Sequence, residues 1–291
     1  MSMPQDLVLI RHGQSEANVR QKASKRGDNS LFTDDLVTVP DNSWRLTELG
    51  AKQANTAGIY LQEKFSQGFD RYIVSPFMRT RETAANLQLP EATWEENRII
   101  RERSWGEIDG LSVAEFERDY PNNALLKKKD PIYWAPPAGE SLATVVENRA
   151  SNFLRGLSRD SSGARVLAVT HGEFITSTRM LIERWADEKF HEIEEDPTQK
   201  IRNCLMVHYT RRNPETGKLA DRLRWVKLAY PKGNEVVESD WSEFDSARRL
   251  TNEQLLNLVE SQERRLVDID KIKSKNGHSE GSKSKDTTSS N

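Results

Sequence analysis

The chain has 291 residues, of which 35% are hydrophobic and 30% charged, so it is long enough to bury a substantial core in one large domain or two small ones. Its 43 basic and 45 acidic residues give a formal net charge of −2, which excludes the strong overall positive charge of a general nucleic-acid or membrane-surface binder. The sequence contains no run near the roughly 20 apolar residues of a membrane span and no secretory-signal pattern, so we expect a cytoplasmic protein without nucleic-acid or membrane partners.

Five short apolar runs have the length and composition of strands that are buried on both faces. Helical patterns lie between them, and strands that alternate with helices predict a layered α/β domain. The predicted strands are residues 7–10, 72–74, 166–169, 205–209 and 223–228. The predicted helices are residues 47–61, 80–87, 140–157 and 174–183.

Two parts of the chain differ in composition from this core. Residues 20–45 are polar and irregular and predict a long loop, and residues 274–291 have the composition of a disordered polar tail. We therefore expect a catalytic domain at residues 1–235, a helical extension at 236–273 and the tail. The extension carries a short apolar seam, and we expect this seam to dock on the main domain and not to form a coiled coil. A homodimer is possible. The seam residues are Leu255, Val259, Gln262, Leu266 and Ile269.

The single cysteine, Cys204, excludes an intramolecular disulfide and a zinc site made of cysteines. It begins the apolar run 204–207, which is typical of a buried strand, so we interpret it as a packed thiol and not as a nucleophile. The His-Glu run at residues 191–195 lacks the second histidine that a zinc-protease motif requires four residues on. Neither kind of zinc site is therefore predicted.

Three of the predicted strands end at side chains that suit phosphate chemistry. Arg11 and His12 follow the first strand, Arg79 lies in the turn after the second, and His171 follows the third. Ligands of an open α/β sheet bind beyond the carboxyl ends of its strands. A histidine that attacks phosphorus must be neutral, and neighbouring guanidiniums both disfavour its protonation and grip phosphate oxygens. An alcohol leaving group also needs a carboxylic acid with a raised pKa as its proton donor.

The residues around these positions resemble the signature of the histidine phosphatase superfamily, which includes the cofactor-dependent phosphoglycerate mutases. The resemblance covers roughly residues 6 to 229 and comprises five blocks in the family's order. They are Arg11-His12-Gly13-Gln14-Ser15-Glu16-Ala17-Asn18, residues 46–50, residues 75–84, Glu102 with Gly106 and Gly110, and Thr170-His171-Gly172.

This resemblance implies a three-layer α/β/α sandwich with a mostly parallel central sheet and a small phosphorylated substrate. It implies that His12 is the nucleophile that carries a transient phosphate, and that Glu102 donates a proton to the leaving oxygen and then activates water. The phosphate pocket would comprise Arg11, Arg79 and His171, with further contacts from Asn18 and Gly172. The family requires no metal, and we expect no cofactor.

The family contains phosphatases and mutases, which share these residues. Glu102 and His171 are 69 positions apart, and the segment between them contains Pro136-Pro137-Ala138-Gly139-Glu140-Ser141. This block resembles an element of the phosphatase branch, although Ala138 stands where glycine is more usual. We therefore favour a phosphomonoesterase. A phosphoglycerate mutase-type phosphotransferase is the first alternative, and a non-catalytic regulatory or binding protein on the same scaffold is the second.

Several other residues have an ordinary structural interpretation. Arg81 is predicted to lie on the surface, and His208 to be a core or surface residue of a strand. The run Lys127–Lys129 is typical of a solvated face, but it lies between Glu102 and His171, so contact with an anionic substrate stays open. Packing and pocket-lining roles stay equally open for Trp105, Tyr133 and Trp134.

Overall fold

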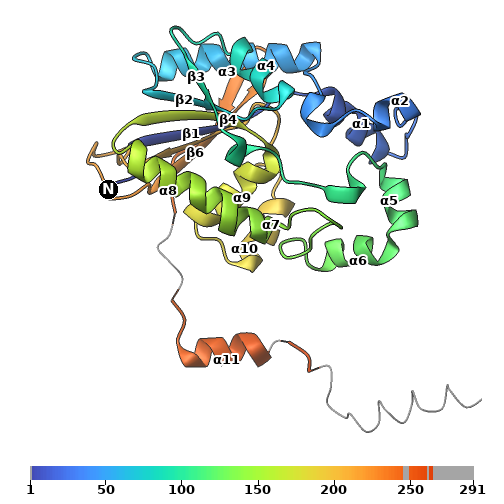
Figure 1. The fold of residues 1–291 in the computed structure, drawn as a ribbon. Coiled ribbons are helices and arrows are strands. Elements are labelled where there is room, and N and C mark those ends of the chain that lie inside the picture. The colour runs from blue at the N-terminus through green and yellow to red at the C-terminus, as the bar shows by residue number, and fades with distance from the viewer. Residues whose placement is uncertain (1, 245–248, 261, 265–291) are drawn as a thin grey trace, which may run out of the picture. The chain divides into compact units, whose positions relative to one another are not determined.

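The computed structural model describes residues 2–244, 249–260 and 262–264 (Figure 1). The chain divides into two units, residues 1–247 and 248–291, which are described separately. No helix among the described residues combines the length and the apolar character needed to cross a membrane.

The first unit is built on a mixed, mostly parallel sheet in the order β3-β2-β4-β1-β5-β6-β7, with β8 paired to β6. The neighbours from β3 to β1 are parallel, whereas β5 to β8 pair antiparallel with their neighbours. The strands are β1 (Asp6–Arg11), β2 (Arg71–Val74), β3 (Trp94–Glu96), β4 (Arg165–Thr170), β5 (Met206–Thr210), β6 (Trp225–Lys232), β7 (Glu235–Glu238) and β8 (Ser242–Glu243). All five predicted strands are present.

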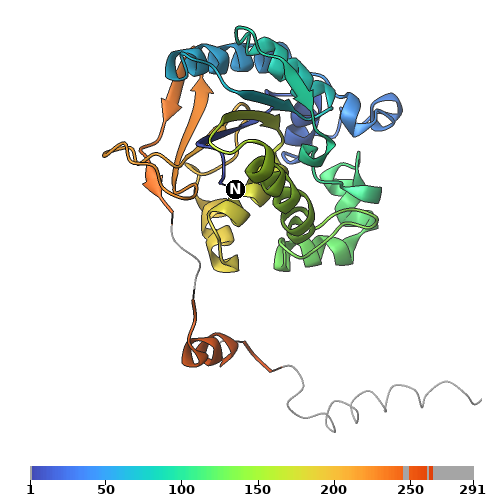
Figure 2. The same cartoon turned by 60° about the vertical axis from the view of Figure 1, so that its left-hand side comes forward.

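Helices cover both faces of this sheet, as the views in Figures 1 and 2 show. On one face α3 (Glu48–Lys64) and α4 (Met78–Asn86) pack against the alternate strand residues Val8 and Ile10. On the other face α8 (Ser151–Asp160) and α9 (Gly172–Ile182) pack against Leu7 and Leu9. Since successive strand residues point to opposite faces, the unbroken apolar run of β1 serves two cores. The predicted three-layer α/β/α sandwich is confirmed.

The predicted helix 140–157 is a composite helical stretch. It begins with α7 (Leu142–Thr144), continues through one π-helical segment, η4 (Val145–Ala150), and ends with α8. The segment before α7 carries α5 (Val113–Asp119) and α6 (Pro121–Lys129), with short 3-10 turns η2 (Arg98–Ile100) and η3 (Gly106–Ile108) ahead of them. Helix α10 (Asp187–Glu195) follows α9.

The prediction of a long loop at residues 20–45 is wrong in part. Helix α1 (Glu16–Ser24) enters this segment, which also contains α2 (Asp34–Val37) and a 3-10 turn, η1 (Asp41–Ser43). A capping box starts α1, because Ser15 accepts a bond from the backbone of Asn18 while the Asn18 side chain accepts one from the backbone of Ser15. This reciprocal pair satisfies amide donors at the helix start and lets a polar sequence form a helix.

The sheet continues past residue 235, where we expected the catalytic domain to end, because β7 and β8 add to it. In the second unit the structure describes α11 (Asn252–Glu260), which contains Leu255 and Val259 of the predicted seam. Leu266, Ile269 and the predicted tail 274–291 lie outside the described residues. The predicted docking of the helix and the homodimer stay predictions.

Candidate active site

Parallel pairing of β1 with β4 brings the two predicted histidines together. Arg11 pairs with Thr170 at the ends of the two strands, and the amide of His12 donates to the carbonyl of Thr170 at 2.9 Å. The next residues therefore emerge side by side, and the ring centres of His12 and His171 are 5.3 Å apart. Both histidines are buried.

The proton of His12 is placed by its backbone neighbour. His12 Nδ1 lies 2.7 Å from the carbonyl oxygen of Gly13. A carbonyl oxygen only accepts hydrogen bonds, so Nδ1 carries the proton and Nε2 keeps its lone pair. Burial and the charges of Arg79 and Arg11 hold the pKa of His12 well below its usual value, and this outweighs the opposing effect of the Gly13 bond. The ring is therefore neutral and nucleophilic at Nε2 near neutral pH.

A close backbone approach fixes the loop after β1. A side chain on Gly13 would place its Cβ 2.4 Å from the carbonyl oxygen of Gly50 in α3, so only glycine fits. The amide of Gly13 donates to Thr83 Oγ1 at 2.9 Å, and this hydroxyl donates to the carbonyl of Arg79. One hydroxyl of α4 thus links the backbone of Gly13 to that of Arg79.

The two predicted arginines approach the site from different elements. Arg11 Nη1 donates to the carbonyl of Ile201 at 2.7 Å, and Arg11 Nε is buried without a hydrogen-bond partner in the described part of the chain. The Arg11 guanidinium lies 3.4 Å from where a Cβ on Gly172 would be. Arg79, on α4, is 4% exposed and pairs with Asp41 of η1.

His171 is fixed by the turn after β2. Its Nε2 lies 2.7 Å from Ser75 Oγ, and the ring of Phe77 packs against it with centres 4.9 Å apart. His171 Nδ1 is buried and has no partner within the residues that the structure describes. Burial, then Arg79, His12 and Arg11, hold the pKa of His171 well below its usual value.

Glu102 follows η2 and has the raised pKa that a proton donor needs. Burial, followed by the charge of Glu173, raises the pKa of Glu102 to about 7 against the opposing charge of Arg79. Glu102 Oε1 accepts a bond from the amide of Arg103 at 2.9 Å. Near neutral pH the carboxyl can therefore both give and take a proton.

The Pro136–Ser141 block supports the segment that carries Glu102. Glu140 accepts bonds from the amide of Ser104 at 2.8 Å and from Arg149 at 2.9 Å, while its carbonyl accepts from Arg103. Ala138 adopts a left-handed φ of 56°, a conformation that favours the glycine more usual there. This block therefore has a structural role beneath the acid.

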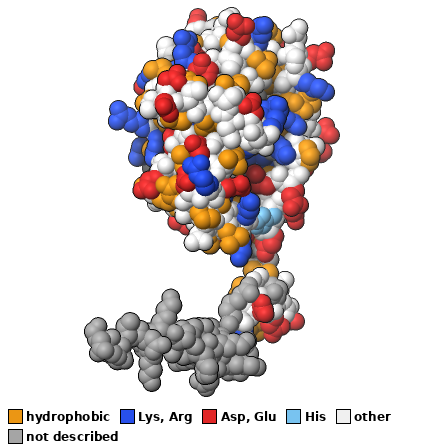
Figure 3. Space-filling model, turned by 90° about the vertical axis from the view of Figure 1, so that its right-hand side faces the viewer, with side chains coloured by type: hydrophobic (Ala, Val, Ile, Leu, Met, Phe, Trp, Pro, Cys, Tyr) orange, Lys and Arg blue, Asp and Glu red, His pale blue; other side chains and the backbone are white. Residues whose placement is uncertain are grey.

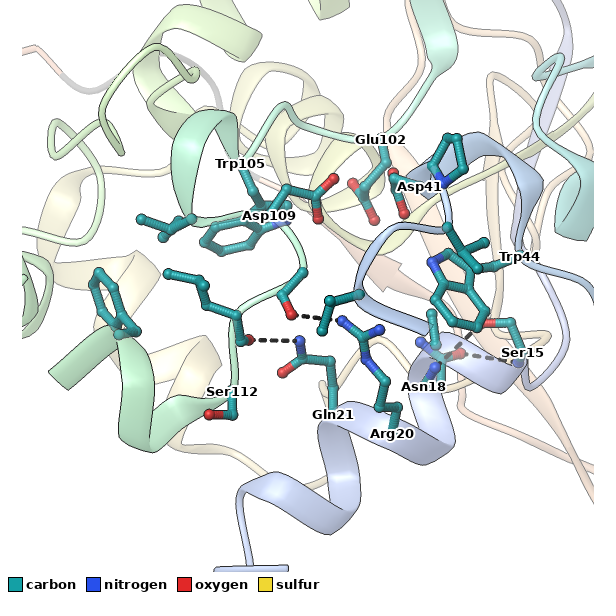
Figure 4. Close-up of a pocket in the computed structure, with 18 of the residues that line it drawn as sticks. Ser15, Asn18, Arg20, Gln21, Asp41, Trp44, Glu102, Trp105, Asp109 and Ser112 are labelled. Atoms are coloured by element: carbon teal, nitrogen blue, oxygen red, sulfur yellow. Dashed lines mark hydrogen bonds between the residues drawn. The ribbon is translucent and has the colours of Figure 1, made fainter. Parts of the chain in front are cut away.

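A cavity of about 440 Å³ opens beside His12 (Figure 4). Among the described residues that line it, the predicted His171 and Gly172 are absent. Its walls include His12, Arg11, Arg79 and Glu102, and Figure 4 shows the carboxylates of Glu102, Asp41 and Asp109 at one end. Asn18 also lines it, and Asn18 Oδ1 accepts bonds from Ser15 and from Asn203 at 2.9 Å. The NH₂ of Asn18 is therefore the part that can donate to a ligand.

Lys127 reaches the cavity from α6. It is the first residue of the Lys127–Lys129 run, for which contact with an anionic substrate was left open. Its Nζ lies 4.8 Å from the ring centre of Trp105, 5.4 Å from Phe116 and 5.6 Å from Trp134. Lys128 instead lies in solvent and pairs with Glu117. Only the first of the three lysines therefore lines this cavity.

The other open residues are placed as follows. Arg81 is on the surface and pairs with Glu96, and His208 is paired with Asp6 in the sheet, both as predicted. Trp105 lines the cavity, Trp134 is packed and Tyr133 is exposed. Cys204 is buried with its pKa raised to about 12 by burial, as expected for a packed thiol.

Sequence reasoning missed Asp41, Asn203 and the roles of Ser75 and Arg103. Ser75 ends a predicted strand directly, which was a usable signal. Asp41 and Asn203 lie in polar segments, where nothing in the local pattern marks them. No group of three or more His, Cys, Asp or Glu side chains in residues 2–244, 249–260 and 262–264 is arranged to hold a metal ion.

A family model and named relatives match more than half of the chain. A family model described as histidine phosphatase superfamily (branch 1) matches residues 7–215. A 2,3-bisphosphoglycerate-dependent phosphoglycerate mutase of Parvibaculum lavamentivorans is 30% identical over 195 residues, which is 64% of this chain and 84% of that protein. A phosphoglycerate mutase-like protein of Arabidopsis thaliana is 26% identical over 273 residues, which is 82% of this chain and 80% of that protein.

Solved structures share the fold at lower identity. A mycobacterial glucosyl-3-phosphoglycerate phosphatase matches with a TM-score of 0.54 and 22% identity, over 70% of this chain and 89% of that one. A phosphoserine phosphatase from Entamoeba histolytica matches with a TM-score of 0.51 and 19% identity, over 71% of this chain and 91% of that one. These two similarities support the architecture of the chain.

Proposed function

The chain belongs to the histidine phosphatase superfamily, and on that premise we propose that it hydrolyses phosphomonoesters without a metal, through a phosphohistidine on His12. The observation that carries the proposal is the hydrogen bond from His12 Nδ1 to the carbonyl of Gly13. It leaves the Nε2 lone pair free in a buried ring whose pKa is depressed.

In the first half-reaction, His12 Nε2 attacks phosphorus, the N–P bond forms and the P–O bond to the alcohol breaks. Arg11 and Arg79 stabilise the charge on the transferring phosphoryl group, which is the main task of a phosphoryl-transfer site. His171 adds a donor at Nδ1, since the Ser75 hydroxyl can donate to its Nε2. The leaving oxygen takes the proton of Glu102, whose pKa of about 7 keeps that proton available.

In the second half-reaction, Glu102, now ionised, takes a proton from water as the water oxygen attacks phosphorus. The N–P bond breaks, Nε2 recovers its lone pair, and inorganic phosphate is released. Each residue returns to its starting protonation state, so the cycle needs no further reactant.

The cavity supports a substrate with a sizeable leaving group. A volume of about 440 Å³ falls in the range of sites that enclose a small organic molecule. Figure 3 shows acidic and basic side chains mixed over one face of the molecule, and the whole chain carries a net charge of only −2. The attraction for a phosphate therefore comes from the buried arginines beside His12. We propose a small phosphorylated metabolite as the substrate.

A phosphoglycerate mutase-type phosphotransferase is the second candidate, because the curated relatives at 26–30% identity are named as mutases or mutase-like. A mutase keeps the phosphohistidine and passes the phosphoryl group to a second hydroxyl, whereas a phosphatase passes it to water. The Pro136–Ser141 block supports the hydrolase, because its sequence resembles an element of the phosphatase branch. A non-catalytic role fits less well, since the nucleophile, both arginines and the acid lie together around one cavity.

The test is the fate of the phosphoryl group. The purified chain should release inorganic phosphate from an aryl phosphate in the presence of EDTA. With 3-phosphoglycerate and a bisphosphate primer it should form little 2-phosphoglycerate. Rapid interconversion of the two phosphoglycerates would favour the mutase, and absence of turnover on every ester would favour the non-catalytic scaffold.

A further inference from the structure

A carboxylate of the chain itself is bound to one of the two phosphate-gripping arginines. Arg79 Nη1 lies 3.0 Å from Asp41 Oδ1, and Arg79 Nη2 donates to Asp41 Oδ2 at 3.2 Å. Nη1 also donates to the backbone carbonyl of Asp41. Both terminal nitrogens of Arg79 therefore face oxygens of one residue.

The segment that presents Asp41 is held on both sides. Arg20 Nη1 donates to the carbonyl of Leu36 at 2.9 Å, and the Arg20 guanidinium lies 5.1 Å from the ring centre of Trp44. Arg20 and Trp44 are both buried, whereas the Asp41 side chain is 29% exposed. Asp41 thus lies on a short, anchored turn, and its side chain is partly open to solvent.

The geometry is that of a competitor for phosphate. Arginine binds carboxylates and phosphates with the same forked pair of N–H groups, so the contacts that Asp41 uses are those that a phosphate would need. If Asp41 stayed in place, its charge would neutralise Arg79 and repel a phosphate dianion at short range. Whether phosphate displaces Asp41 or binds beside it, binding costs the free energy of the Asp41–Arg79 interaction.

We propose that Asp41 competes with phosphate for Arg79 and thereby lowers the affinity of the site for phosphate, including the inorganic phosphate that the reaction releases. The inference rests on the proposed function only in assigning that phosphate as a product. An ester gains binding energy from the contacts of its leaving group with the cavity, whereas inorganic phosphate has only its own oxygens to offer. A weakened phosphate grip therefore leaves inorganic phosphate with little affinity for the site and limits product inhibition, while the ester keeps the contacts of its leaving group.

The test compares phosphate binding by the full chain and by three variants. Asp41→Asn and Asp41→Ala remove the charge, and the second also removes the side-chain hydrogen bonds. Asp35→Asn is the matched control, because Asp35 lies on the same segment, is exposed and accepts a hydrogen bond from the nearby Thr33 hydroxyl. The probes are inorganic phosphate, titrated calorimetrically, and orthovanadate, measured as an inhibitor of aryl phosphate hydrolysis.

Both Asp41 variants should bind phosphate at least about tenfold more tightly than the unmodified chain, since neither offers a charged competitor for Arg79. Asp35→Asn should bind as the unmodified chain does. Unchanged or weaker phosphate binding in both Asp41 variants would overturn the inference, because Asp41 would then hold Arg79 in place and not compete with the ligand. Tighter binding in a chain that hydrolyses no ester would contradict the proposed function and leave the competition standing.

Discussion

The site has two regions that differ in how they are held. The catalytic floor, defined as Arg11, His12, Arg79 and His171, depends on paired strands and on glycine contacts between backbones. The cover, defined as residues 16–45 and 103–140, depends largely on long side chains that reach backbone carbonyls, such as Arg20 to Gly110 at 2.7 Å. If the chain is the phosphatase that we propose, we expect the floor to carry out the chemistry common to all substrates and the cover to determine which leaving groups are accepted.

Glu102, at the junction of floor and cover, gives the largest contrast between substrates. Glu102→Gln should lower kcat/KM for alkyl phosphates about 10²–10⁴-fold, because an alkoxide leaves poorly without a proton. Aryl phosphates, whose phenolates leave without help, should lose less than about tenfold. Glu107→Gln is the matched control, since Glu107 is exposed on η3. Equal losses on both classes of ester would show that Glu102 is structural.

The pH dependence should separate the same two classes of ester. The proton on Glu102 is needed in the first half-reaction, and burial raises its pKa to about 7. As the pH rises through about 7, this proton is lost, so kcat/KM for an alkyl phosphate should fall about tenfold per unit above it. This limb should be absent from the profile of an aryl phosphate. An alkyl profile that stays flat to pH 9 would contradict the role of Glu102.

Lys127 tests the selectivity of the cover with a smaller effect. Lys127→Met should raise KM about tenfold for an ester whose leaving group carries an extra anionic group. For phenyl phosphate, whose leaving group carries no extra charge, both kcat and KM should stay unchanged. Lys128→Met is the control, because Lys128 points to solvent beside Glu117. Equal effects of the two substitutions, or an equal change for both esters, would show that Lys127 only packs against its aromatic rings.

The same division explains which parts of the site the sequence predicts. The strand ends of the floor are visible because apolar runs stop abruptly at Arg11 and His12 and again at His171. Parallel pairing then places these ends at one edge, a rule that holds for the whole class of sheets. The sequence alone therefore predicts a site suited to phosphate chemistry at this edge of the sheet.

The cover could not be predicted in this way. Asp41 and Arg20 lie in a polar segment without hydrophobic periodicity, and their partners Arg79 and Gly110 are 38 and 90 positions away in the chain. Contacts between charged side chains and distant carbonyls leave no periodic trace in the sequence. Helix α1 was missed for a related reason, because its start depends on a two-residue capping box and not on an apolar face.

The most direct test of the account is a rapid-quench experiment with an aryl phosphate labelled on phosphorus. The unmodified chain should carry a covalent label during turnover that is stable in base and lost in acid, as expected for a phosphohistidine. In His12→Ala the label should be absent and kcat should fall roughly 10⁴-fold or more, as when the nucleophile of a catalytic unit is removed. A label that persists in this variant, or hydrolysis that continues undiminished, would contradict the assignment of His12 as the nucleophile.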